Sequence, residues 1–144
     1  MEKQKAKYIY GLLEKQFRRY YEKAAKTYNI GLTLMQLLET RLDTVVYRAG
    51  YALTQNQARQ LVGHGHVQVD GQKVNIPSFQ VKPGMKISLD PNLLQTISDS
   101  KQQVIDVPIW IKVSDKSAQV LDMPTREQIS PIINEQLIVE YYSR

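Results

Sequence analysis

Residues 58–74 read ARQLVGHGHVQVDGQKV, and the spacing of apolar residues changes from helical to extended within this stretch. The first part spaces its apolar residues three and four apart, as on one face of a helix, and ends at Gly63. The second part alternates apolar and polar residues on both sides of Asp70-Gly71. This pair is typical of a type I′ hairpin, because both turn positions need a positive φ. The stretch therefore predicts a short helix that leads directly into a β-hairpin.

Helical spacing also dominates the sequence before this stretch. Residues 1–28 contain no proline and space their apolar residues three and four apart, which predicts one helix that stops near Asn29. Thr33 matches a capping box and predicts the start of a second helix, which ends at Gly50. A third helix is predicted from Thr54, which opens another capping box.

The sequence after the hairpin predicts more strands and a final helix. Strands are expected at 85–89, at 104–113 with an interruption at Pro108, and at 118–121. Residues 92–103 are polar and weakly patterned, which predicts a loop or short helix, and residues 124–131 are expected to be irregular. A helix capped by Asn134 ends the chain. Helices, a mainly antiparallel sheet and a terminal helix together predict an α+β fold.

Composition limits the class of protein. A chain of 144 residues with 42% hydrophobic and 23% charged residues has the length and balance of one globular domain, alone or with a small appendage. It has no cysteine, which excludes disulfides, a thiolate nucleophile and cysteine-based zinc sites. No apolar run approaches the roughly 20 residues of a membrane-spanning helix, and no apolar segment follows the charged first residues as in a secretory signal. We therefore expect a soluble intracellular protein without a membrane partner.

Positive charge is concentrated at the N-terminus. Residues 1–26 carry eight basic and three acidic side chains, so they hold a net charge of +5, the value for the whole chain. Such a segment indicates either a polyanionic partner, whose condensed counterions are released on binding, or a solvated basic helix face. Arg18-Arg19 directly precede Tyr20-Tyr21, which couples phosphate-binding groups to rings that can stack on bases or pack at a domain edge.

Residues 41–75 contain the polar groups best suited to bind a phosphate backbone. The helix predicted at Thr54 would offer unpaired backbone N–H groups at its start, and such groups bind phosphates. The helices and hairpin are expected to place eight side chains at one edge: Arg41, Arg48, Thr54, Arg59, Gln60, His64, His66 and Lys73. An ordinary structural edge of an α+β domain is the alternative interpretation of the same residues.

Residue types that support catalysis are sparse. His64 and His66 are two apart, but a transition-metal site generally needs three or four protein ligands, so hydrogen bonding or contact with a phosphate or base is the better interpretation. Glu39 and Asp43 are four apart and could pair, although neighbouring basic residues favour a solvated helix. The sequence contains no glycine-rich phosphate loop and no nucleophile elbow. It therefore predicts no enzyme activity, no metal site and no cofactor.

Three segments resemble the bacterial-type small-subunit ribosomal protein four family: RLDTVVYR at 41–48, ARQLVGHGHV at 58–67 and VDGQKVNIPS at 69–78. Further matching segments are YGLLEKQFRR at 10–19, VKPG at 81–84 and NEQLIVEYYSR at 134–144. The resemblance spans nearly the whole chain. It implies a helical domain formed by residues 1–40 and completed by 128–144, with an RNA-binding domain of the family's type inserted at 41–127.

The resemblance also implies a function. Members of this family are structural constituents of the small ribosomal subunit that bind its ribosomal RNA, nucleate its assembly and contribute to translational accuracy. Implied partners are small-subunit ribosomal RNA, two neighbouring ribosomal proteins, and messenger RNA where it enters the subunit. The implied location is a cytoplasmic or organellar ribosome. In this interpretation Arg18, Arg19 and the eight polar side chains in 41–75 bind RNA phosphates and read the shape of the RNA.

Three features depart from the family pattern. The sequence starts after the position expected for the family's additional N-terminal basic segment, which binds a metal in some members; a truncated or partial chain and a shortened homologue are both compatible with this start. Leu53 and Gln55 occupy positions that are usually basic, and DPNLL at 90–94 replaces a usually basic stretch. Fewer phosphate contacts imply RNA binding that is weaker and less sensitive to salt.

Two other functions are compatible with an RNA-binding domain of this type. One is a stand-alone RNA-binding module in regulation or ribosome quality control, which the match at both chain ends disfavours. The other is an RNA-modifying enzyme or a synthetase, which would need a separate catalytic domain for which 144 residues leave no room.

Overall fold

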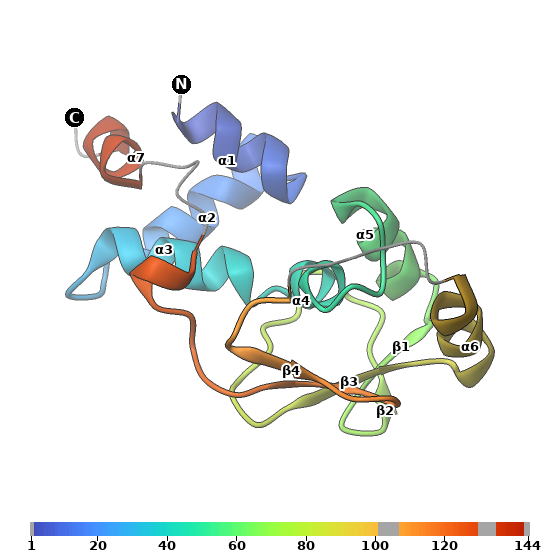
Figure 1. The fold of residues 1–144 in the computed structure, drawn as a ribbon. Coiled ribbons are helices and arrows are strands. Elements are labelled where there is room, and N and C mark those ends of the chain that lie inside the picture. The colour runs from blue at the N-terminus through green and yellow to red at the C-terminus, as the bar shows by residue number, and fades with distance from the viewer. Residues whose placement is uncertain (1, 101–106, 130–134, 143–144) are drawn as a thin grey trace. The chain divides into compact units, whose positions relative to one another are not determined.

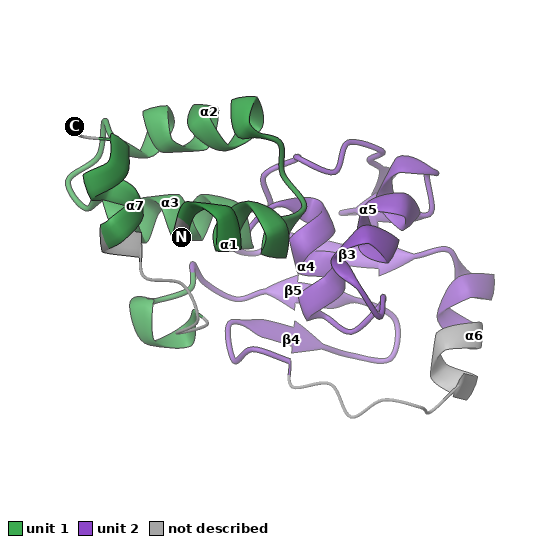
Figure 2. Cartoon of the chain, turned by 90° about the horizontal axis from the view of Figure 1, so that it is seen from above, with its two compact units in different colours: residues 1–39, 124–144 green, residues 40–123 purple. Residues whose placement is uncertain are grey.

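The computed structural model describes residues 2–100, 107–129 and 135–142, and it divides into two compact units (Figure 2). Unit 1 comprises Met1–Glu39 and Pro124–Arg144, so both ends of the chain belong to it. Unit 2 comprises Thr40–Met123 and is inserted between these ends in sequence. The predicted α+β fold class is confirmed, with helices in unit 1 and both helices and a sheet in unit 2.

Unit 1 is helical. Its elements are α1 (Glu2–Tyr10), α2 (Glu14–Ala24), α3 (Ile30–Glu39), a 3₁₀ turn (Arg126–Gln128) and α7 (Glu135–Tyr142). Apolar side chains from all four α-helices form its core, among them the buried Tyr10, Phe17, Leu34 and Ile138. Because Ile138 belongs to α7, this core joins the two ends of the chain.

Unit 2 packs two helices on one face of an antiparallel sheet. The helices are α4 (Leu42–Arg48) and α5 (Gln55–Gly63), and α6 (Pro91–Ser100) follows the third strand. The strands are β1 (Val67–Val69), β2 (Gln72–Lys73), β3 (Lys86–Leu89), β4 (Ile111–Val113) and β5 (Ala118–Val120). Their order is β2-β1-β3-β5-β4, and every pair is antiparallel. Figure 1 shows α4 and α5 above the strands. Among the described residues, no helix is long and apolar enough to span a bilayer.

The alternation of side chains along the strands gives the sheet two different faces. Val67 and Val69 of β1 are buried with Ile87 and Leu89 of β3, in one core with apolar residues of α4 and α5. Residues between them, such as Gln68, point to the opposite face, because successive side chains of a strand alternate. The sheet therefore has a face covered by helices and an open face.

The β1–β2 hairpin forms as predicted. Asp70 and Gly71 have φ values of 50° and 84°, the left-handed values that a type I′ turn requires. The strands pair directly across this turn, with Gln68 opposite Lys73. The Asp70 carboxylate accepts a hydrogen bond of 3.0 Å from the backbone N–H of Lys86, which ties the turn to β3.

The prediction of a single helix over residues 1–28 is wrong. The first helix ends at Tyr10, where Gly11 adopts a φ of 65° and the N–H of Leu12 donates to the carbonyl of Lys7 at 2.8 Å. A glycine here terminates the helix because it adopts a left-handed φ without steric cost. The chain then restarts as α2.

The second predicted helix is also two helices, with a different start. α3 begins three residues before Thr33, and the side chain of Asn29 caps it by accepting a hydrogen bond of 3.2 Å from the N–H of Leu32. Arg41 has an extended backbone and pairs with Gln80 in an isolated bridge. This long-range pairing interrupts the helical pattern before α4.

The segment after β3 contains more helix than predicted. The loop or short helix expected at 92–103 is α6, and a 3₁₀ turn lies within the segment expected to be irregular. The strand expected at 104–113 begins at Ile111. Its residues 104–106 lie outside the described residues, as does the predicted cap Asn134.

Candidate nucleic-acid interface

A buried ion pair lies where α4 begins. The side chain of Arg41, 1% exposed, donates two hydrogen bonds of 3.0 Å to the carboxylate of Asp43. Asp43 also accepts a hydrogen bond of 2.8 Å from the backbone N–H of Thr44. The burial and the two hydrogen bonds of this guanidinium favour a structural role for Arg41 over the predicted contact with RNA.

Arg59 of α5 lies at the edge of the same ion pair. Its Nε is 3.9 Å from Oδ2 of Asp43, and 37% of its side chain is exposed. Nearby, Gln55 donates a hydrogen bond of 2.9 Å to the hydroxyl of Thr44. Asp43 and Thr44 thus couple α4 to α5 and hold Arg59 at the surface. A half-exposed guanidinium in this position can bind a phosphate.

Apart from Arg59, the exposed side chains of α5 are polar and uncharged. Thr54 caps the helix by accepting a hydrogen bond of 3.0 Å from the N–H of Gln57, as predicted. The side chain of Gln57 accepts a hydrogen bond of 2.8 Å from the backbone N–H of Leu53. In a standard capping box the donor would be the backbone N–H of the N-cap residue itself, here Thr54. Gln60 and His64 are both exposed, four residues apart, at the far end. These uncharged side chains can form hydrogen bonds with RNA, whereas the electrostatic attraction of α5 comes from Arg59.

The two histidines have different surroundings. His64 is exposed, whereas Nδ1 of His66 lies 2.9 Å from Oδ2 of Asp90. The N–H of Asp90 donates to the carbonyl of His66 at 3.0 Å, so this pair links the residue before β1 to the residue before α6. The two imidazole rings have centroids 6.3 Å apart. Within residues 2–100, 107–129 and 135–142, no group of three or more His, Asp or Glu side chains is arranged to hold a metal ion.

Arg48 and Lys73 lie on different sides of unit 2. Arg48 is the last residue of α4, and its guanidinium lies 5.4 Å from the centroid of the Tyr47 ring. Lys73 is exposed on β2 directly opposite Gln68, so its side chain points to the open face of the sheet. The expectation of one shared edge is therefore wrong for Lys73, which lies across the sheet from α4 and α5.

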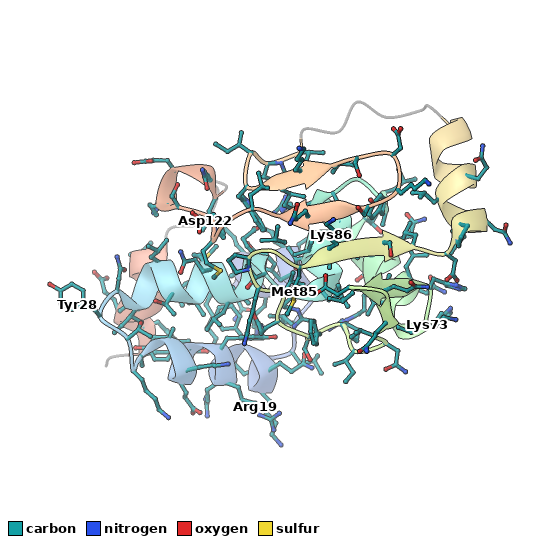
Figure 3. All side chains as sticks on the ribbon, turned by 90° about the horizontal axis from the view of Figure 1, so that it is seen from below. Arg19, Tyr28, Lys73, Met85, Lys86 and Asp122 are labelled. Carbon is teal, nitrogen blue, oxygen red and sulfur yellow. The ribbon has the colours of Figure 1, made fainter. Side chains whose placement is uncertain are left out.

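Unit 1 carries a row of exposed cations on α2 and the turn after it, which we call the basic stripe. Its members are Lys15, Arg18, Arg19, Lys23 and Lys26. Figure 3 shows Arg19 projecting outward from α2. The acidic Glu22 is exposed on the same helix. The predicted contacts include Arg18 and Arg19 but not the three lysines, which extend the row at spacings of three and four residues along the helix and the turn after it.

The tyrosines beside these arginines pack inside unit 1. Tyr20 and Tyr21 are half-buried against its core. Tyr21 stacks on Tyr142 of α7, with ring centroids 4.3 Å apart. Of the two interpretations that the sequence left open, packing within the domain is the one that the structure supports.

Glu14 joins α2 to both ends of the chain. Its carboxylate lies 2.6 Å from Nζ of Lys3 and 3.0 Å from Nζ of Lys7, and it accepts a hydrogen bond of 3.3 Å from the hydroxyl of Tyr142. The hydrogen bond from Lys3 lowers the pKa of Glu14 from its ordinary 4.5 to about 2. The helix that carries the basic stripe is thus held at its start by an ionised carboxylate.

Two protein-family models match the chain in consecutive segments. The Ribosomal protein S4/S9 N-terminal domain matches residues 1–39, and the S4 domain matches residues 40–87. The small ribosomal subunit protein uS4 of Dictyoglomus thermophilum is 51% identical over 150 residues, which cover 99% of this chain and 72% of that protein. The chain belongs to the uS4 family. The family resemblance inferred from the sequence is confirmed.

Two further uS4 proteins extend this similarity. The protein of Roseiflexus castenholzii is 49% identical over 156 residues, covering 100% of this chain and 74% of that protein. The protein of Cutibacterium acnes is 49% identical over 150 residues, covering 99% of this chain and 75% of that protein. The two family models meet between residues 39 and 40, which is also where unit 1 passes into unit 2.

The departures from the uS4 pattern noted in the sequence have structural counterparts. Leu53 is exposed just before α5, and Gln55 is bonded to Thr44 rather than presenting a charge. The segment 90–94 forms the start of α6 and the residue before it. Within the described helices α4 and α5, Arg48 and Arg59 carry the positive charge.

Proposed function

We propose that this uS4-family chain is a structural, non-catalytic component of the small ribosomal subunit that binds small-subunit ribosomal RNA. The observation that carries the proposal is the consecutive match of two ribosomal family models, which fall on units that both expose cations. Sequence identity near 50% to proteins named for the small subunit supports the same assignment. It also favours a ribosomal role over a stand-alone regulatory or quality-control module.

The proposed RNA contacts fall into two groups on the two units. Unit 1 contributes Arg18 and Arg19 within the basic stripe. Unit 2, as the inserted RNA-binding domain, contributes Arg48, Thr54, Arg59, Gln60, His64, His66 and Lys73. The guanidinium and ammonium groups bind backbone phosphates, and the uncharged side chains add hydrogen bonds, so the protein reads RNA shape more than base sequence.

We further propose that this binding nucleates assembly of the subunit and contributes to translational accuracy. A chain that binds RNA through two separate units can bring two RNA segments together early in assembly. Neighbouring ribosomal proteins, and messenger RNA where it enters the subunit, are the other proposed partners. Reconstitution of small subunits with and without this chain tests the assembly role: omission should stop later proteins from joining, and normal particles would contradict it.

Binding to a transcript of the 5′ domain of small-subunit ribosomal RNA tests the main proposal. The measurement is made across a salt series, with an unrelated structured RNA of equal length as control. We expect tighter binding to the ribosomal transcript and an affinity that falls with salt, because phosphate contacts release counterions. Equal and weak binding to both RNAs would contradict the proposal.

A further inference from the structure

The open face of the sheet in unit 2 carries three lysines, which the proposed function uses only in part. Lys73 on β2 lies opposite Gln68, and Gln68 lies opposite Ser88 of β3. Lys86 of β3 and Lys112 of β4 both lie opposite Gln119 of β5. Directly opposed residues of antiparallel strands point to the same face, so the six side chains share one surface. We call this surface the lysine face: Gln68, Lys73, Lys86, Ser88, Lys112 and Gln119.

The lysine face is exposed and unbalanced in charge. All three lysines are exposed, and none has an ion-pair partner among the described residues. The five strands, all of which the structure describes, contain no acidic residue. The β1–β2 turn contributes Asp70, whose carboxylate is already bonded to the backbone N–H of Lys86, and the β4–β5 turn contributes the exposed Asp115 next to Lys116. Figure 3 views the sheet from this side and labels Lys73 and Lys86.

The lysines span the whole sheet. Lys73 is on one edge strand, Lys86 is on the central strand and Lys112 is on the other edge strand. With strands about 4.8 Å apart, the row is roughly 19 Å wide. A partner must therefore present negative charge over a distance comparable to the width of a nucleic-acid duplex rather than at one point.

We infer that the lysine face is a second RNA-binding surface, which docks on the phosphate backbone of a double-helical RNA segment. The inference rests on the proposed function and adds a surface to it, on the side of the sheet away from α4 and α5. The lysines bind phosphates, and Gln68, Ser88 and Gln119 can hydrogen-bond to phosphate and 2′-hydroxyl groups between them. Double-helical RNA is recognised mainly through such backbone contacts.

The composition of the face favours a duplex over the other polyanions. Single-stranded nucleic acids are bound by stacking their bases on aromatic side chains, and the lysine face contains none. Protein interfaces are depleted of lysine and depend on aromatic or aliphatic residues at their centre. Here the centre of the face is occupied by Lys86, Ser88 and Gln119.

The test is the full-length chain with Lys73→Gln, Lys86→Gln and Lys112→Gln combined. The probe is a 20-base-pair RNA duplex of arbitrary sequence, with affinity measured across a salt series. We expect affinity to fall about tenfold or more at low salt, and the slope of log affinity against log salt to decrease by about 2–3, because each lysine contacts about one phosphate. The matched control replaces the same lysines by arginine, which keeps the charge and should keep the affinity. Unfolding curves of both variants should match the parent protein, since the replaced side chains are exposed.

Separate outcomes distinguish the two proposals. If the glutamine variant binds the duplex as tightly as the parent, the lysine face is not an RNA surface and the inference is overturned. If it instead loses binding to polyglutamate while keeping the duplex, the face binds an acidic protein and the inference is also overturned. If the parent protein itself fails to prefer the 5′-domain transcript, the proposed function fails, whatever the duplex result.

Discussion

At the scale of the residue, Asp43 decides how the helices of unit 2 meet. Its carboxylate is fully buried and neutralises the buried guanidinium of Arg41. The variant Asp43→Asn leaves that guanidinium without a counter-charge, so we expect a loss of roughly 3–5 kcal/mol in the free energy of unfolding. Urea unfolding of the full chain measures it. The control is Asp115→Asn in an exposed turn, where a change above about 0.5 kcal/mol would show that the assay does not report on burial.

Arg59 is partly exposed, so we expect its substitution to affect RNA binding more than the stability of the fold. Asp43 keeps Arg41 as a partner when Arg59→Ala removes the weaker contact at 3.9 Å, so stability should fall by about 1 kcal/mol or less. RNA affinity should fall roughly tenfold at 0.1 M salt, with a salt slope smaller by about 1. Filter binding to the 5′-domain transcript measures both quantities. The control is Lys116→Ala, in a turn outside the proposed contacts, which should bind the transcript as tightly as the parent protein does. If Arg59→Ala also binds with unchanged affinity, Arg59 is not part of the interface.

At the scale of the element, the β1–β2 turn depends on the conformation of Gly71. Its φ of 84° strains any residue with a Cβ, although the space around it is open. We expect Gly71→Ala to destabilise the protein by about 1–2 kcal/mol. Gly63→Ala is the matched comparison, because Gly63 ends α5 with nothing within 4 Å of the added Cβ. That change should be neutral or stabilise by up to about 1 kcal/mol. Equal effects of the two substitutions in thermal unfolding would contradict the assignment of strain to the turn.

Elements were predictable from the sequence where neighbouring residues determine them. The hairpin follows from Asp70-Gly71, and the start of α5 follows from the hydroxyl of Thr54. The end of α3 did not follow, because it depends on the pairing of Arg41 with a residue far along the chain. The candidate site also divides into features set by local sequence and features set by long-range packing. The exposed cations on α2 could be recognised from their spacing in the sequence. The burial of Arg41 could not, because it depends on packing between distant segments.

At the scale of the whole molecule, Glu14 makes the stability of unit 1 depend on pH. Its pKa of about 2 in the folded chain lies below the ordinary 4.5, so its ionised form stabilises the fold. That contribution is fully present above pH 4.5 and is lost as the pH falls toward 2. We therefore expect Glu14→Gln to lower the melting temperature at pH 6, and the difference from the parent to shrink as the pH approaches 2. Thermal unfolding from pH 2 to 6 measures this.

The control for the pH dependence is Glu22→Gln. Glu22 is exposed on the same helix, and no ion pair or hydrogen bond of its side chain is present in the described part of the chain. Its substitution should leave the pH profile of the parent unchanged. A profile for Glu14→Gln that runs parallel to that of the parent at every pH would show that the carboxylate of Glu14 titrates normally.

The contribution of both chain ends to unit 1 has a consequence for the order of events during synthesis. The 84 residues of unit 2, Thr40–Met123, are synthesised between the first three helices of unit 1 and its last helix. At about 5–20 residues per second, that interval is roughly 4–17 s. Throughout it, Phe17 and Leu34 lack the apolar cover of Ile138, and by its end every core residue of unit 2 has been synthesised. The nascent chain therefore holds all core residues of its inserted unit before it holds those of unit 1, so the core that supports the basic stripe is completed later than that of unit 2.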